Sequence, residues 1–370
     1  MIFHTTLPIL APLTKGGNLP FRRLCIDLGA EITMSEMAYS RQVVRGSKSE
    51  MALLRKHASE GCFGVQLASG KPEEAVKAAK IAADRGAAFV DLNCGCPIHD
   101  VVRRGMGATL LRRPAALARI VAAMVEAVDV PVTVKLRSGW SEGKDNALEI
   151  GRAVQEAGAA AVTLHARARE QRYTKAANWE LIGEMVSTLS IPVIGNGDLL
   201  THYEVRRRQR ESGCAAVMLG RGALIKPWLF REVAEGREIE PAAAERVAIY
   251  ARLVRYLKEH FREDEKGRER TMRFLPWHFD FFCRYRPLPE AEWRERAKEH
   301  PLLQTRIPDE EGLPLLERVL RDPRPEVHQR LADELWACDG DEDAVARFEA
   351  VGQESPPEAG EHADVKVAHG

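Results

Sequence analysis

Two closely spaced cysteines are the first residues of this chain that could take part in a reaction. Cys94 and Cys96 form a C-x-C pair, and Cys96 lies between Gly95 and Pro97, where a chain turns. A thiol with an ordinary pKa of about 8.5 is protonated at neutral pH and can donate that proton to a carbanion or enolate. The pair can also be two inert core thiols. No second Cys/His pair follows at ligand spacing, so we expect no metal.

Other polar residues follow short apolar stretches, one stretch after another along the chain. They are Gln66, Asn93, Lys135, Arg137, His165, Arg167, Asn196, Asp198 and Arg221. Any one of them is unremarkable at the end of a strand, but their shared position at successive strand ends predicts a single pocket.

The last two of these stretches end in glycines, at Gly197 and at Gly220-Arg221-Gly222. Glycines beside a fixed cation indicate a phosphate cup, although ordinary strand-to-helix turns have similar sequences. A phosphate cup with Lys135 and Gln66 nearby suits a flavin. A cation stabilises negative charge on the reduced ring, and an amide can both donate and accept hydrogen bonds there.

The elements that would position these residues are eight apolar strands that alternate with amphipathic helices. We expect the strands at residues 9–13, 30–35, 63–68, 89–93, 132–137, 161–165, 193–196 and 216–220. Strands that are almost entirely apolar are typical of a parallel sheet buried on both faces. The fold class predicted is α/β, a (β/α)8 TIM barrel followed by a smaller all-helical domain. A doubly wound open sheet is the alternative, but it requires a glycine-rich turn that residues 11–14 do not form.

Periodicity and charge divide the chain further. We expect the catalytic barrel at residues 1–236, a helical domain at 237–306, an acidic helical extension at 307–352 and a disordered tail at 353–370. The net charge of the whole chain is zero, but residues 307–370 hold six basic and seventeen acidic side chains. The rest therefore carries a surplus of eleven positive charges, which permits a polyanionic partner.

Composition excludes several classes of protein. No apolar run approaches the ~18 residues of a membrane span, and the first ten residues do not resemble a signal peptide. The seven cysteines are scattered without a disulfide framework, so we expect a cytoplasmic protein. A monomer is expected.

Eight segments in order resemble the dihydrouridine synthase family. They are Ala11-Pro12-Leu13, residues 64–68 (GVQLA), 91–97 (DLNCGCP), 105–111 (GMGATLL), 134–140 (VKLRSGW), 163–167 (TLHAR), 195–198 (GNGD) and 218–221 (MLGR). Residues 273–285 and 97–101 are similar to the third eukaryotic-type branch of the family, whose target is a uridine in the variable loop of tRNA.

The resemblance implies a tRNA-dihydrouridine synthase that uses FMN, re-reduced by NADPH, to reduce the C5–C6 double bond of uridine. Hydride would pass from flavin N5 to C6, and Cys96 would protonate C5. Asn93 and Arg167 would hold the base or the flavin, and Cys94 leaves a second thiol two residues from the first. The residues implied in FMN binding are Pro12, Leu13, Thr14, Gln66, Lys135, His165, Asn196, Gly197, Asp198, Gly220 and Arg221.

Arginines interleaved with aromatic residues mark residues 266–286 as a candidate tRNA contact. Arg268, Arg270 and Arg286 are the expected phosphate ligands, and most of the aromatic residues are expected in the core. The cluster at residues 206–210 is a further candidate or a solvated helix face. Two other functions stay open: a small-molecule flavoenzyme of the dihydroorotate kind, and a tRNA-binding barrel without catalysis.

Overall fold

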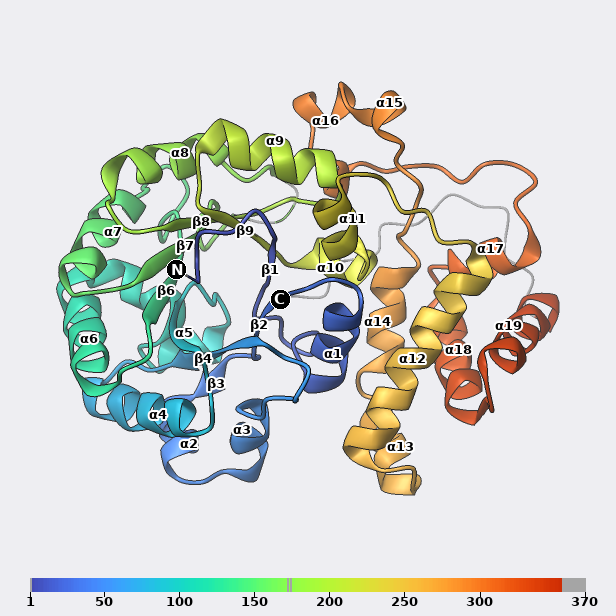
Figure 1. Ribbon diagram of the computed structural model, residues 1–370, viewed down its shortest axis with the longest axis horizontal. Coiled ribbons are helices and arrows are strands. Elements are labelled where there is room, and N and C mark those ends of the chain that lie inside the picture. The colour runs from blue at the N-terminus through green and yellow to red at the C-terminus, as the bar shows by residue number, and fades with distance from the viewer. Residues whose placement is uncertain (1, 172, 174, 355–370) are drawn as a thin grey trace.

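Eight parallel strands close into a barrel in the computed structural model, which describes residues 2–171, 173 and 175–354 (Figure 1). The strands are β1 (Ile9–Leu10), β2 (Ile32–Met34), β4 (Cys62–Ala68), β5 (Phe89–Cys94), β6 (Val132–Arg137), β7 (Ala161–His165), β8 (Val193–Asn196) and β9 (Ala216–Leu219). β9 pairs back with β1, which closes the circle. The short β3 (Ala38–Tyr39) pairs with the end of β4 and continues the line of β2. The predicted barrel is confirmed.

Helices surround the barrel, and the longer ones, such as α4, α6 and α7, bury an apolar face. In α4, for example, Ala75, Ala78, Ala79 and Ala82 are all buried, at the spacing of one helix face. The barrel helices are α1 (Leu19–Asp27), α2 (Ser40–Val44), α3 (Lys48–Leu53), α4 (Pro72–Asp84), α5 (His99–Arg103), α6 (Pro114–Ala127), α7 (Ala147–Glu156), α8 (Trp179–Thr188), α9 (His202–Ser212), α10 (Arg221–Ile225) and α11 (Leu229–Glu235), with a 3-10 helix at Gly107–Arg112.

Alternation along each strand sorts side chains between two cores. In β5, Phe89 packs inside the barrel with Ile9, whereas Val90 and Leu92 pack outward against the helices. Successive side chains of a strand point to opposite faces. This alternation sends Asp91 and Asn93 to the barrel interior and Cys94 to the helix layer.

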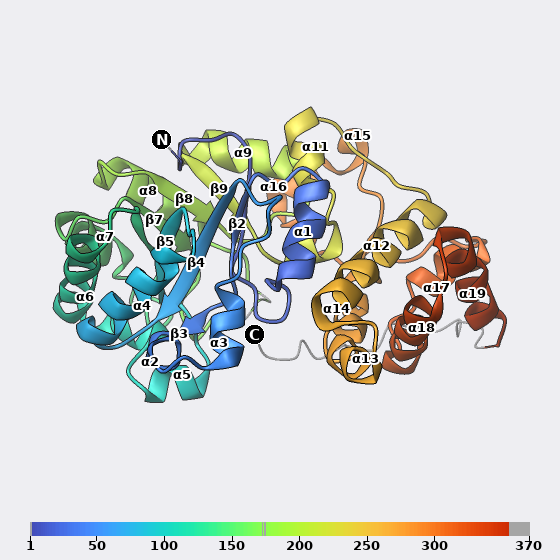
Figure 2. The same ribbon diagram turned by 60° about the horizontal axis from the view of Figure 1, so that its bottom comes forward.

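A helical module lies against one side of the barrel in both views (Figures 1 and 2). It contains α12 (Ala243–Phe261), α13 (Glu265–Thr271), α14 (Leu275–Phe282), α15 (Glu290–Trp293), α16 (Arg296–Glu299) and a 3-10 helix at Leu302–Gln304. α1 packs on α12, and the ring of Phe21 in α1 stacks on His278 of α14 at 4.9 Å. Among the described residues, none of the helices combines the length and the apolar character needed to cross a bilayer.

The acidic extension packs against the helical module and does not stand apart from it. Its helices are α17 (Leu315–Leu320), α18 (Pro325–Ala337) and α19 (Asp341–Glu354), and Phe348 of α19 is fully buried 6.0 Å from Phe279. Ion pairs add to this contact, including Arg246–Glu317 at 2.5 Å. The tail predicted to be disordered from residue 353 is helical at 353–354, and residues 355–370 lie outside the described residues.

Candidate active site

A buried hydrogen-bond ladder forms the floor of the barrel mouth. Asp91 accepts hydrogen bonds from Gln66 Nε2 at 2.8 Å and from Thr133 Oγ1 at 2.6 Å, and Gln66 Oε1 accepts one from Asn93 Nδ2 at 2.8 Å. Burial raises the pKa of Asp91 to about 6 against the opposing effect of these donors. Asp91 was not among the predicted site residues, although the alternation of β5 places it inside the barrel. The ladder ties β4, β5 and β6 together and fixes the orientation of the Gln66 and Asn93 amides.

Asn93 also sets the turn that carries Cys96. Its Oδ1 accepts hydrogen bonds from the backbone N–H groups of Gly95 at 3.2 Å and Cys96 at 2.9 Å. Arg137 Nε donates to the carbonyl of Gly95 at 2.7 Å, and Ala108 N–H donates to the carbonyl of Cys96 at 3.0 Å. The backbone of the thiol-bearing turn is therefore held from three sides.

The two thiols of the C-x-C pair occupy different environments. Cys94 is fully buried in the helix layer, and burial raises its pKa well above the ordinary value. Cys96 is partly exposed and packs near Tyr39 and Met106. Burial raises the pKa of Cys96 too, against the lowering effects of the Ile98 N–H and of Arg137. Cys96 is thus a protonated thiol at the barrel mouth, and Cys94 faces away from it.

Lys135 and Asn196 face each other across the mouth. Lys135 Nζ donates to Asn196 Oδ1 at 3.1 Å, while Asn196 Nδ2 donates to the carbonyl of Met218 at 2.8 Å. Burial and, to a smaller extent, the neighbouring Arg137 lower the pKa of Lys135 to about 8, against the opposing effect of Asp91. A partly exposed lysine in this position is mostly charged at neutral pH and loses its charge under mildly alkaline conditions.

His165 is held as a neutral imidazole. Burial lowers its pKa well below the ordinary value, and the neighbouring cations lower it further. Its Nε2 lies 3.1 Å from Arg167 Nη1. A guanidinium can only donate, so Nε2 accepts and the proton sits on Nδ1.

Arg167 was expected to contact the substrate or the flavin, but the structure encloses it. Its side chain has no exposed surface, and Nε and Nη2 donate to the carbonyl of Lys175 at 2.9 and 2.6 Å. Nη2 also pairs with Asp198 Oδ2 at 2.5 Å. Arg167 therefore positions His165 and Asp198, because none of its nitrogens is left open toward the mouth.

The loops after β8 and β9, which contain Gly197, Asp198, Gly220 and Arg221, form a cradle in which Arg221 is an accessible cation. Gly197 has a φ of +140°, and a Cβ there would lie 2.6 Å from Ala177 Cβ, so only glycine fits. Asp198 Oδ1 accepts from Arg221 Nη2 at 3.1 Å, and the Arg221 side chain retains 20% exposure at the start of α10. A Cβ on Gly220 would make an ordinary van der Waals contact with Leu13 at 3.7 Å.

Two further features border the cradle. Pro12, Leu13 and Thr14 follow β1, with Thr14 exposed and Leu13 beside Gly220. The ring of Tyr173 lies 3.8 Å from the guanidinium carbon of Arg221. Sequence reasoning did not predict Tyr173, because no pattern in its loop distinguishes it.

The arginines predicted to bind tRNA differ in accessibility. Arg270 is exposed, and Arg268 is about half exposed with Asp333 at 2.5 Å. Arg286 has a side chain that is only 9% exposed, pairs with Asp309 at 2.7 Å and donates to two backbone carbonyls. The structure therefore contradicts the expectation that Arg286 is open to phosphate. The core position of most aromatic residues is confirmed, with Phe279, Phe281, Phe282 and Tyr285 buried.

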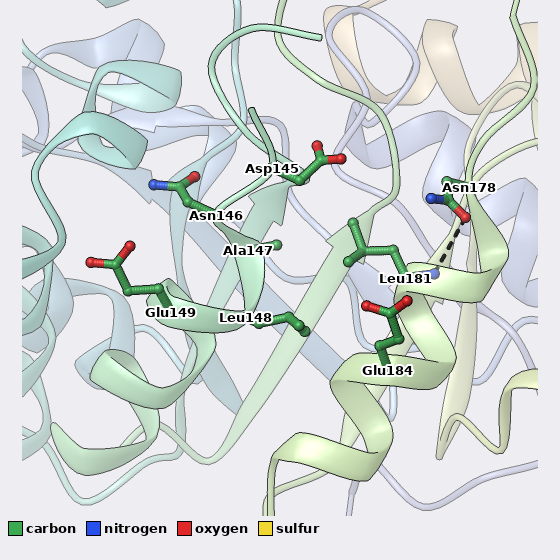
Figure 3. A pocket seen from close by; sticks show the side chains of 8 residues that line it. All are labelled: Asp145, Asn146, Ala147, Leu148, Glu149, Asn178, Leu181 and Glu184. Carbon is green, nitrogen blue, oxygen red and sulfur yellow. Dashed lines mark hydrogen bonds between the residues drawn. The ribbon is translucent and has the colours of Figure 1, made fainter. Parts of the chain in front are cut away.

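A separate cavity of about 350 Å³ lies between the first turns of α7 and α8, outside the barrel (Figure 3). Its charged lining residues are Asp145, Glu149 and Glu184, all carboxylates. Asn178 Oδ1 caps α8 by accepting the N–H of Leu181 at 3.3 Å. None of the predicted site residues lines this cavity, so the barrel mouth is the candidate active site.

Comparisons with known proteins agree with this geometry. The family model described as "Dihydrouridine synthase (Dus)" matches residues 9–307. A protein of Cryptococcus neoformans named tRNA-dihydrouridine(47) synthase [NAD(P)(+)] is 43% identical over 331 residues, which cover 85% of this chain and 45% of that protein. A human protein named tRNA-dihydrouridine(47) synthase [NAD(P)(+)]-like is 42% identical over 295 residues, covering 79% of this chain and 45% of its own length.

The chain thus spans a little under half the length of the curated relatives that it matches. Among solved structures, histamine dehydrogenase from Rhizobium sp. 4-9 aligns with a TM-score of 0.50 at 15% identity, over 67% of this chain and 48% of that one. This likeness shows the barrel fold alone.

Proposed function

Since the chain belongs to the dihydrouridine synthase family, we propose that it reduces the C5–C6 double bond of a uridine in tRNA. Its relatives carry position 47 in their names, and we propose the same position for this chain. The observation that carries the proposal is the protonated, partly exposed thiol of Cys96, which the Asn93 turn presents at the barrel mouth.

We propose FMN as the cofactor, because the residues of the mouth fit its two ends. Gly197 and Gly220 directly follow the neighbouring strands β8 and β9, at the rim where a barrel of this kind binds phosphate, and Arg221 supplies a cation there. Lys135 offers a cation at the opposite end. Asp91 engages one of the two amide hydrogens of Gln66, and the other has no partner among the residues that the structure describes. Pro12–Thr14, His165, Asn196 and Asp198 complete the proposed site.

When bound, reduced FMN supplies the hydride, and we propose NADPH as its reductant, in line with the nicotinamide dinucleotide in the relatives' names. Cys96 holds the proton for C5. Lys135 is the cation that stabilises negative charge developing on O4 of the base, because His165 is neutral and Arg167 is enclosed. A uracil face is closed within a base stack, so the uridine must leave its stack to reach the mouth. Asn93 would then contact the base.

We propose that the protein is cytoplasmic. All seven cysteines are free thiols, which agrees with a reducing compartment such as the cytoplasm. A monomer remains a prediction.

The test is a reaction of the purified protein with NADPH and tRNA transcripts that carry unmodified uridine. A flavin that copurifies should absorb near ~450 nm, and mass spectrometry should find one uridine, at position 47, heavier by two hydrogen atoms. Free uracil, uridine and orotate serve as controls. Turnover of a free pyrimidine would favour the small-molecule enzyme, and a colourless protein that binds tRNA without taking up FMN would remove the enzymatic proposal.

A further inference from the structure

Three potential metal ligands meet at the junction between the barrel and the helical module. His202 begins α9, Glu238 lies in the segment between α11 and α12, and Glu290 begins α15. Each offers one ligand atom, and these three atoms all lie within 4.8 Å of one another. The residues are far apart in sequence, so no local spacing predicts the cluster.

The imidazole of His202 has no hydrogen-bond partner among the described residues. The residue is 98% buried, since its exposure is 2%, and neither Nδ1 nor Nε2 makes a hydrogen bond within the described parts of the chain. Glu290 Oε2 lies 3.7 Å from Nε2, which is beyond hydrogen-bond length. Buried polar atoms are almost always satisfied, so an unpartnered ring that faces two carboxylates indicates a missing ligand.

The charges around the cluster leave room for a cation. Glu238 and Glu290 lie side by side, and Glu238 Oε1 accepts the backbone N–H of Glu290. Arg294 approaches Glu290 Oε1 only to 3.4 Å, and the nearby Lys226 is already paired with Glu232 at 2.6 Å. Burial lowers the pKa of His202 against the effect of the two glutamates, and the nearby Lys226 and Arg206 also lower it, so the ring is neutral. Metal binding requires a neutral imidazole and ionised carboxylates.

We propose that His202, Glu238 and Glu290 bind one divalent transition-metal ion, with water completing the shell. One imidazole and two carboxylates suit Zn²⁺, whose bonds to N and O are about 2.0–2.2 Å. Tetrahedral ligands then lie roughly 3.3 Å apart, so the three groups must close by about 1–1.5 Å. Glu238 and Glu290 are only partly buried and can rotate to do so.

The ion would fasten the segment that follows residue 286 to the barrel. That segment is already tied to α9: Tyr203 Oη donates to the carbonyl of Leu288 at 3.1 Å, and Glu204 Oε1 accepts the N–H of Leu302 at 3.0 Å. The role is structural, since the cluster shares no residue with the barrel mouth. The proposal departs from the expectation of no metal, which considered only residues close in sequence.

The test is a Zn²⁺ titration of the untagged protein, stripped with a chelator and read by competition with a chromogenic zinc indicator. We expect one equivalent to bind, and the affinity to fall at least ~10-fold in Glu238→Gln and in Glu290→Gln, since each removes one ligand charge. Both changes conserve side-chain size, so these variants remain informative if His202→Ala does not fold. Glu292→Gln, an exposed neighbour on α15, and His300→Ala are matched controls that should bind like the parent.

A second readout is thermal unfolding with and without Zn²⁺. An ion that binds only the folded state at ~100 times its Kd raises the folded-to-unfolded ratio about 100-fold, so Tm should rise in the parent and in the controls. The rise should shrink in Glu238→Gln and Glu290→Gln. The proposal is overturned if the protein does not bind stoichiometric Zn²⁺. It is also overturned if both glutamine variants retain binding in full, because zinc would then be held elsewhere, for example by surface thiols.

Discussion

Replacing the two thiols one at a time separates a proton donor from a core residue. In Cys96→Ala the backbone of the turn should stay in place, because Asn93 and Ala108 hold it through the N–H and the carbonyl of residue 96. Flavin binding and the oxidation of NADPH by oxygen should persist, since neither reaction uses the thiol. Uridine reduction should fall by ~10²–10⁴, the usual value of a positioned acid, which corresponds to about 3–5 kcal/mol of barrier.

Cys94→Ala should lower stability and leave the rate of uridine reduction unchanged. Its side chain is fully buried in the helix layer, so the variant should lose about 1 kcal/mol of stability and keep its rate per folded molecule. The assay is single-turnover reduction of tRNA by pre-reduced enzyme, with thermal unfolding measured beside it. Cys96→Ser is a further control, since it conserves size but replaces a thiol with a much weaker acid. A large loss of rate in Cys94→Ala with normal turnover in Cys96→Ala would refute the assignment of Cys96 as the donor.

Three further predictions concern the cation, the cradle and the RNA contact. The rate of uridine reduction should fall as pH rises through about 8, because Lys135 loses its charge there. The thiol of Cys96 stays protonated in this range because its pKa is raised. Lys135→Met should reduce uridine slowly at every pH, and its pH–rate profile should lack the fall near pH 8. Gly197→Ala should weaken FMN binding by ~10-fold or more in a fluorescence titration, since its Cβ would lie 2.6 Å from a neighbouring Cβ at a φ of +140°, and unchanged affinity would contradict the cradle. The double variant Arg268→Ala, Arg270→Ala should flatten the slope of log tRNA affinity against log salt by up to ~2 and leave Tm unchanged. Arg286→Ala should instead lower Tm, because it removes a mostly buried arginine from its ion pair with Asp309. An unaltered slope in the double variant would show that the RNA contact lies elsewhere.

Much of the barrel was predictable from local pattern. Strands such as residues 132–137 and 161–165 were predicted with the bounds that β6 and β7 have, because a strand buried on both faces must be almost entirely apolar. The polar residues at the strand ends were equally visible, since the carboxyl ends of parallel strands in a barrel share one rim. Cys94 and Cys96 differ because β5 ends at Cys94 and the turn held by Asn93 carries Cys96 out to the barrel mouth, a change of direction that the C-x-C spacing does not reveal.

Accessibility and pairing were not predictable, because they depend on residues that the chain brings together from a distance. Arg167 and Arg286 look like free cations in the sequence, but Arg167 pairs with Asp198 in the core and the mostly buried Arg286 pairs with the partly exposed Asp309. The acidic extension has the composition of a solvated appendage, yet its apolar face covers the helical module. His202 meets its two glutamates only after α9 and α15 dock. Local propensity and alternation are properties of neighbouring residues and can be read along the chain, whereas burial and ion pairing arise between distant segments and exist only once the chain has folded.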